Sequence, residues 1–89
     1  MNVKVVKDSF EQLLAGNWPS DVIDKIVELE EYFAITLLGH DNFNCLFITK
    51  SDGSRHWADK LDEAFDKKIR EFTFEEFEKF LETELRKAS

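Results

Sequence analysis

The central stretch, residues 32–57, constrains the fold most, because it is the most apolar run in an otherwise charged sequence. In residues 43–50 apolar side chains occupy both alternating faces: Phe43, Cys45 and Phe47 on one, Leu46 and Ile48 on the other. Such two-sided strands are typical of the buried middle of a sheet. Residues 32–38 alternate in the same way, and residues 39–42 form a turn cluster. We therefore expect two neighbouring strands, the second of them central and largely buried.

The dipeptide Asp52-Gly53 predicts a hairpin after the second strand, because the turn positions of a two-residue hairpin need positive φ. A third strand over residues 54–57 would then return antiparallel. In the competing interpretation, Ser54 caps a helix that starts at Arg55 and places these side chains on one face: Trp57, Leu61 and Phe65. The hairpin is the favoured interpretation.

The N-terminal third has helical patterns. Residues 2–6 are rich in β-branched valine and form either an edge strand or an ordered lead-in. A helix then opens with the spacing of a capping box, either Asp8 with Glu11 or Ser9 with Gln12, and ends at Gly16 by a left-handed backbone. Ser20 would cap a second helix that runs to about Glu30 and has these residues on its apolar face: Val22, Ile23, Ile26, Val27 and Leu29.

The C-terminal third predicts two more helices. One begins at Asp59 and ends near Lys67 and Lys68, whose charges complement the helix dipole. The last helix has Thr73 as N-cap, with a capping box completed by Glu76 and a hydrophobic staple between Phe72 and Phe77. Its core stripe comprises Phe77, Phe80, Leu81 and Leu85, and residues 86–89 are expected to fray.

Together these patterns predict one α+β domain over residues 1–89. N-terminal helices precede a three-stranded antiparallel meander over about residues 31–57, and two C-terminal helices pack on the sheet. In element order, size and charge this layout is similar to that of some small acidic phage-encoded inhibitors of CRISPR nucleases, although no sequence motif carries the similarity.

The charge balance disfavours some classes of partner. The chain has 19 acidic and 12 basic residues, a net charge of −7, which disfavours direct nucleic-acid binding and attachment to anionic membranes. The longest apolar run is far shorter than the roughly 20 residues of a membrane helix. The start of the chain lacks the apolar region of a signal peptide, and a single cysteine fits a reducing compartment, so the expected location is the cytoplasm.

No catalytic, metal or cofactor site is predicted. His40 and Asp41 supply at most two ligands in a turn, where a metal needs three or four. His56 has no nucleophile or orienting carboxylate in a local motif. Cys45, in the middle of an apolar strand, is expected to be a buried structural thiol.

Acidic stripes on the two C-terminal helices are the candidate working surface. They are either solvated faces or carboxylates that meet a basic groove on a partner. Trp18 is either an exposed anchor or a cap on the core. The candidate partner-binding residues are Trp18, Asp59, Asp62, Glu63, Asp66, Glu75, Glu78 and Glu82.

We therefore expect a non-enzymatic protein-binding module, a small acidic inhibitor or regulator that docks onto a partner protein with a basic surface. One alternative is an acidic mimic of nucleic acid that blocks a nuclease or a DNA-binding protein. Another is a small-molecule-binding protein or enzyme that uses His40, Asp41 or His56. Whether the domain is a monomer or a homodimer stays open.

Overall fold

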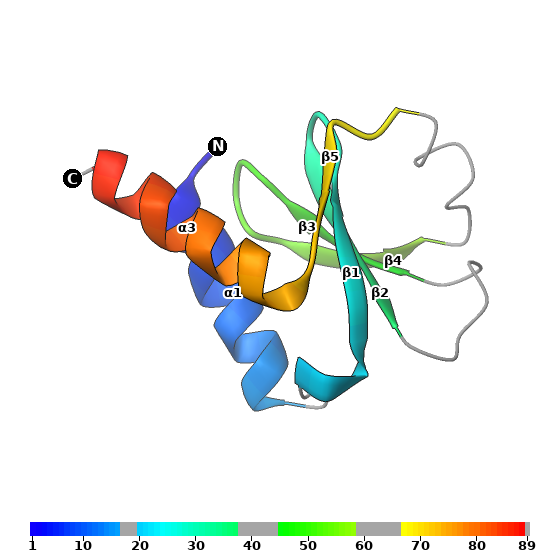
Figure 1. Cartoon of the computed structure of the whole chain (residues 1–89). Coiled ribbons are helices and arrows are strands. Elements are labelled where there is room, and N and C mark those ends of the chain that lie inside the picture. Colours follow the sequence, from blue (N-terminus) through cyan, green and yellow to red (C-terminus); the bar gives the residue numbers. More distant parts are fainter. Residues whose placement is uncertain (17–19, 38–44, 59–66, 89) are drawn as a thin grey trace.

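The computed structural model describes residues 1–16, 20–37, 45–58 and 67–88 (Figure 1). The helices are α1 (Val3–Ala15), a 3-10 turn η1 (Ser20–Val22) and α3 (Phe74–Ala88). The strands are β1 (Ile23–Glu28), β2 (Tyr32–Leu37), β3 (Cys45–Thr49), β4 (Arg55–Ala58) and β5 (Arg70–Phe72).

The strands form one antiparallel sheet in the order β4-β3-β2-β1-β5. Strands β1 to β4 follow one another as a meander, and β5 returns to pair with the free side of β1. Helices α1 and α3 cover one face of this sheet (Figure 1). The structure confirms a small α+β domain, but the sheet extends beyond the predicted three strands by β1 and β5.

Strands β2 and β3 are buried on both faces, as their sequences predict. Phe33 lies opposite Ile48, and both point to the helices. Ala34 lies opposite Phe47, and both belong to a second cluster on the outer face of the sheet. Cys45 is also fully buried in this outer cluster.

The predicted hairpin between β3 and β4 is confirmed, and the alternative helix from Arg55 is wrong. The amide of Thr49 donates to the carbonyl of Ser54 (2.8 Å), and the amide of Gly53 donates to the carbonyl of Thr49 (2.8 Å). The connection is therefore longer than a two-residue turn. Gly53 adopts φ 73° and, within the described part of the chain, is the one residue with positive φ.

The helix predicted from Ser20 to about Glu30 is wrong, because residues 23–28 form strand β1. Ser20 opens only the 3-10 turn. The apolar residues here satisfy helical spacing, but Ile26 faces the helices while Val27 and Leu29 face the outer cluster. A short strand that is buried on both faces has a continuous apolar pattern, which periodicity does not separate from a helix.

Helix α1 starts earlier than predicted. Asn2 is the N-cap, and its Oδ1 accepts a hydrogen bond from the amide of Val5 (3.5 Å). Residues 3–6 are therefore helical rather than a strand or lead-in, and no capping box forms at Asp8 or Ser9. The helix ends before Gly16 as predicted, but Gly16 has φ −88° and so does not use the left-handed conformation.

Helix α3 confirms its predicted start and core stripe. The amide of Glu76 donates to Thr73 Oγ1 (3.2 Å), and the amide of Thr73 donates to Glu76 Oε1 (2.9 Å). The rings of Phe72 and Phe77 lie 5.6 Å apart, which is the expected staple. The helix continues to Ala88, so the helical conformation includes Arg86 and Lys87.

The core between helices and sheet is built around phenylalanine rings. The Phe77 ring makes edge contacts with Phe10 and Phe33, with both centroid distances 5.0 Å. Phe80 lies over Phe72 with their ring centroids 4.9 Å apart. Rings give a small domain much buried apolar area per residue, which offsets its high proportion of surface.

Candidate functional site

The structure places only part of the predicted partner-binding set. Glu75, Glu78 and Glu82 lie on α3. The helix predicted from Asp59 lies outside the described residues, and so do these candidates: Trp18, His40, Asp41, Asp59, Asp62, Glu63 and Asp66.

Glu75, Glu78 and Glu82 form what we name the acidic flank of α3. Their spacing of three and four residues places them along one side of the helix, and all three are exposed. This side lies toward α1: the hydrogen bond and charge of Glu11 raise the pKa of Lys7, and Glu82 contributes to the same shift. Capping and the phenylalanine contacts therefore hold three carboxylates outward next to the neighbouring helix.

The acidic flank differs from the other carboxylates of α3 in its partners. Glu76 is used in the capping box, and Glu84 accepts a hydrogen bond from Lys87 (3.4 Å). The three carboxylates of the flank form no hydrogen bond or ion pair with any residue that the structure describes. Like charges at this spacing cost a helix about 0.2–0.5 kcal/mol per pair. The repulsion within the flank is therefore not relieved by a hydrogen bond or ion pair among these residues, although Lys7 attracts Glu82.

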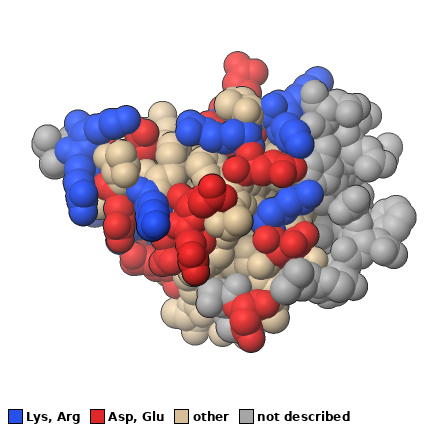
Figure 2. All heavy atoms as spheres, viewed as in Figure 1, with Lys and Arg blue, Asp and Glu red and all other residues tan. Residues whose placement is uncertain are grey.

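Basic side chains border the acidic residues. Figure 2 shows acidic residues gathered over the helical layer with lysine and arginine beside them, and alternating charges over the sheet. The visible surface is therefore mixed rather than one continuous acidic patch. A partner that binds this surface would therefore need positive charges placed opposite a row of carboxylates, and a uniformly positive surface would fit it less well.

A buried carboxylate, Glu28, holds three parts of the sheet together. Its oxygens accept hydrogen bonds from Lys50 Nζ (2.8 Å) and Arg70 Nε (2.5 Å). Burial alone would raise the pKa of Glu28, but these bonds and the two positive charges outweigh burial and lower the pKa. Because both Glu28 oxygens have cationic partners, we interpret this cluster as structural: it connects β1, β5 and the end of β3.

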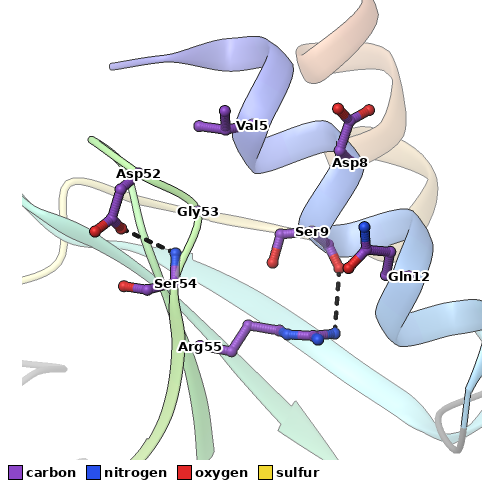
Figure 3. A pocket seen from close by; sticks show the side chains of 8 residues that line it. All are labelled: Val5, Asp8, Ser9, Gln12, Asp52, Gly53, Ser54 and Arg55. Atoms are coloured by element: carbon purple, nitrogen blue, oxygen red, sulfur yellow. Dashed lines mark hydrogen bonds between the residues drawn. The ribbon is translucent and has the colours of Figure 1, made fainter.

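A hollow that the sequence did not predict lies between α1 and the β3–β4 hairpin. Figure 3 shows Ser9 and Gln12 on the helix facing Ser54 and Arg55 on the hairpin. Arg55 crosses the gap, and its Nη1 donates to the Ser9 carbonyl (3.5 Å). No local signal marks this hollow, because it depends on how a helix and a distant hairpin pack together.

His56 and Cys45 occupy structural positions. The His56 ring lies 5.4 Å from the ring centroids of both Tyr32 and Phe47. Burial raises the pKa of the Cys45 thiol to about 12, which confirms the prediction of a buried thiol. Within the described ranges, no three His, Cys, Asp or Glu side chains come together to hold a metal ion.

Helices in the described ranges are too short and too polar to cross a membrane. Comparison of the chain with protein-family models, with curated proteins and with solved structures gives no match, so the assignment of a function depends on the residues alone.

Proposed function

We propose that this protein is a non-enzymatic protein-binding module, an inhibitor or regulator that docks its acidic flank onto a basic surface of a partner protein. The observation that carries the proposal is the row of three exposed carboxylates on α3, which form no hydrogen bond or ion pair with the described residues. Carboxylates arranged in this way attract a basic surface and speed its association.

The repulsion between neighbouring carboxylates of the flank supports a role in binding. Glu75 and Glu78 are three residues apart, and Glu78 and Glu82 are four apart, so both pairs repel. A cation in a partner would relieve this repulsion and form charge-assisted hydrogen bonds, which are stronger than neutral ones. Binding would then replace contacts of these carboxylates with water by contacts with the cations of the partner.

The test starts with an affinity pull-down from a bacterial lysate at low salt, in which we expect a stoichiometric partner. A triple charge reversal, Glu75→Lys, Glu78→Lys and Glu82→Lys, should lower its affinity by about a hundredfold or more, as expected when several interfacial charge contacts become repulsive. Raising the salt concentration should slow association of the wild-type protein.

A matched control separates the flank from net charge. Asp24, Glu30 and Glu31 are exposed and lie on or directly after β1, so none of them belongs to α3. Reversal of these three acids changes the net charge by the same amount and should leave affinity within about threefold of wild type, as is usual for charges outside the interface. Equal losses in both variants would show that only the overall charge matters, and unchanged affinity in the flank variant would refute docking through α3.

Mimicry of nucleic acid is a narrower form of the proposal, favoured by the arrangement of the three carboxylates in one row. In this case double-stranded DNA should compete with the protein for its partner, and the flank variant should lose the competition. A partner that binds DNA and this protein simultaneously would exclude mimicry while leaving docking intact. The contacts of His56 do not support the alternative of a small-molecule-binding protein or enzyme, because its ring packs against aromatic side chains.

A further inference from the structure

The groove between α1 and β4 is a second candidate binding surface, and it lies on the other side of α1 from the acidic flank. Two hollows of about 450 and 420 Å³ adjoin along it and share Gln12 and Arg55. The first lies toward the hairpin tip, and the second extends to Gly16 and Trp57. We call this combined feature the α1–β4 groove.

One wall of the groove is an edge of the sheet. In the sheet that the structure describes, β4 pairs with β3 on one side only. His56 lines the second hollow although its cross-strand partner, Phe47, belongs to the outer face. The hollow therefore reaches the backbone of β4, where an edge strand presents N–H and C=O groups that can pair with another chain.

Arg55 supplies a positive charge in the middle of the groove. Its one hydrogen bond within the described part of the chain goes to the Ser9 carbonyl, at the long distance of 3.5 Å (Figure 3). Other cations of the sheet lie within ion-pair distance of a carboxylate: Lys25, Lys50 and Arg70. A guanidinium has five N–H donors in a planar fork, so Arg55 retains donors for a carboxylate ligand.

The two ends of the groove differ in chemistry. Asp8 and Asp52 line the end at the hairpin tip. The opposite end has an apolar floor of Leu13 and Leu46, and Trp57, which is 57% exposed, stands beside it. From the hairpin tip onward the groove therefore presents negative charge, positive charge and then apolar surface.

We propose that the α1–β4 groove binds an extended segment of a partner protein that carries a basic, an acidic and an apolar side chain in this order. The segment adds its backbone to the edge of β4, its acidic side chain binds Arg55, and its apolar side chain covers Leu13 and Leu46 beside Trp57. Residues 5–16 of α1 rise about 17 Å, the length of about five extended residues. Strand addition of this kind combines main-chain hydrogen bonds for affinity with side-chain pockets for specificity.

This inference rests on the proposed function as a protein-binding module and adds the chemistry of a partner segment. The probe is a phage-displayed library of random eight-residue peptides, selected on the immobilised full-length protein. Enriched peptides should carry the order basic, acidic, apolar. A selected peptide that is N-methylated at alternate residues should bind at least about tenfold more weakly in one of the two phases, because the loss of a single main-chain hydrogen bond already weakens binding by about this factor.

Two variants with the same change of charge make the test specific. Arg55→Glu should lower the affinity of the selected peptide at least about tenfold, because a charge-assisted bond becomes a repulsion. Lys67→Glu, at an exposed position before β5, should leave it unchanged. Thermal unfolding of both variants checks that the fold is intact.

The proposal is overturned if no sequence is enriched, if enriched peptides lack an acidic residue, or if they bind the Arg55→Glu variant as tightly as wild type. Strand addition is overturned if both N-methylated peptides lose the same affinity, or if neither loses affinity. The triple reversal of the acidic flank should leave peptide binding intact, because the flank lies on the other side of α1. Failure of the groove and failure of the flank are therefore distinguishable.

Discussion

Replacement of Gly53 by alanine tests how the β3–β4 hairpin packs on α1. Gly53 sits at φ 73°, where a side chain meets its own backbone. A Cβ added at Gly53 would also lie 2.6 Å from the carbonyl oxygen of Val5 and 3.0 Å from its carbonyl carbon. Both obstacles are backbone atoms, so no side-chain rotation relieves the contact.

The positive φ and the contact with Val5 together give the expected loss of stability in Gly53→Ala. A left-handed backbone costs a residue with a Cβ about 1–2 kcal/mol, and an extra carbon forced into a packed site costs about 1–3 kcal/mol. We therefore expect Gly53→Ala to lower the free energy of unfolding by about 3 kcal/mol. Domains of this size are typically stable by about 4–13 kcal/mol, so the loss is a large fraction of the total.

Urea unfolding followed by circular dichroism measures the effect. With a slope of about 1 kcal/mol per molar urea, the midpoint should fall by about 3 M. Gly53→Asn separates the causes, because asparagine tolerates positive φ but still has a Cβ. If the contact with Val5 dominates, both variants lose similar stability, and if φ dominates, asparagine recovers about 1 kcal/mol. A loss below about 1 kcal/mol in Gly53→Ala would refute the packing of the hairpin on the first turns of α1.

Three further predictions concern the fold. Glu28→Gln should lower stability by about 2 kcal/mol at pH 7, because a buried carboxylate loses its charge between two cations. Since the folded-state pKa of Glu28 is lowered, the stability that its charge adds is present above the unfolded pKa of about 4.3 and is lost as pH falls through the folded pKa. Urea unfolding of the wild type and of Glu28→Gln at pH 7 and at pH 3 checks this. An equal difference in stability between the two proteins at both pH values would contradict it. Thr73→Ala should cost about 1 kcal/mol through loss of the α3 cap, measured by thermal unfolding. Cys45, with its pKa raised to about 12, should react with a thiol reagent roughly a thousandfold more slowly in the native protein than in urea, and equal rates would contradict its burial.

Local signals in the sequence predicted the elements that depend on local physics. The Asp52-Gly53 pair indicated the hairpin because few residues besides glycine adopt positive φ. The residues around Thr73 indicated the start of α3 because capping involves neighbours three residues apart. The same signals made the acidic flank predictable, because the start of a helix and its core stripe together determine which of its residues are exposed.

Elements that depend on distant contacts were missed. Strand β5 contains only three residues and becomes a strand by pairing with β1, more than 40 positions earlier. Strand β1 in turn has apolar residues on both faces, so its pattern matched a helix equally well. The α1–β4 groove has the same origin, because Gln12 and Arg55 come together only when the hairpin packs against the first helix.

Helix α1 lies between the two proposed surfaces, but different contacts hold each of them. On one side the Phe10 ring lies 5.6 Å from Phe74 and 5.0 Å from Phe77. On the other, the first turns of α1 meet the hairpin at Gly53. Helix α3 also packs on the sheet through the Phe33 and Phe72 rings, independently of the hairpin. A change at Gly53 that leaves the chain folded should therefore weaken peptide binding in the groove much more than docking through the acidic flank, because only the groove uses the contact between α1 and the hairpin.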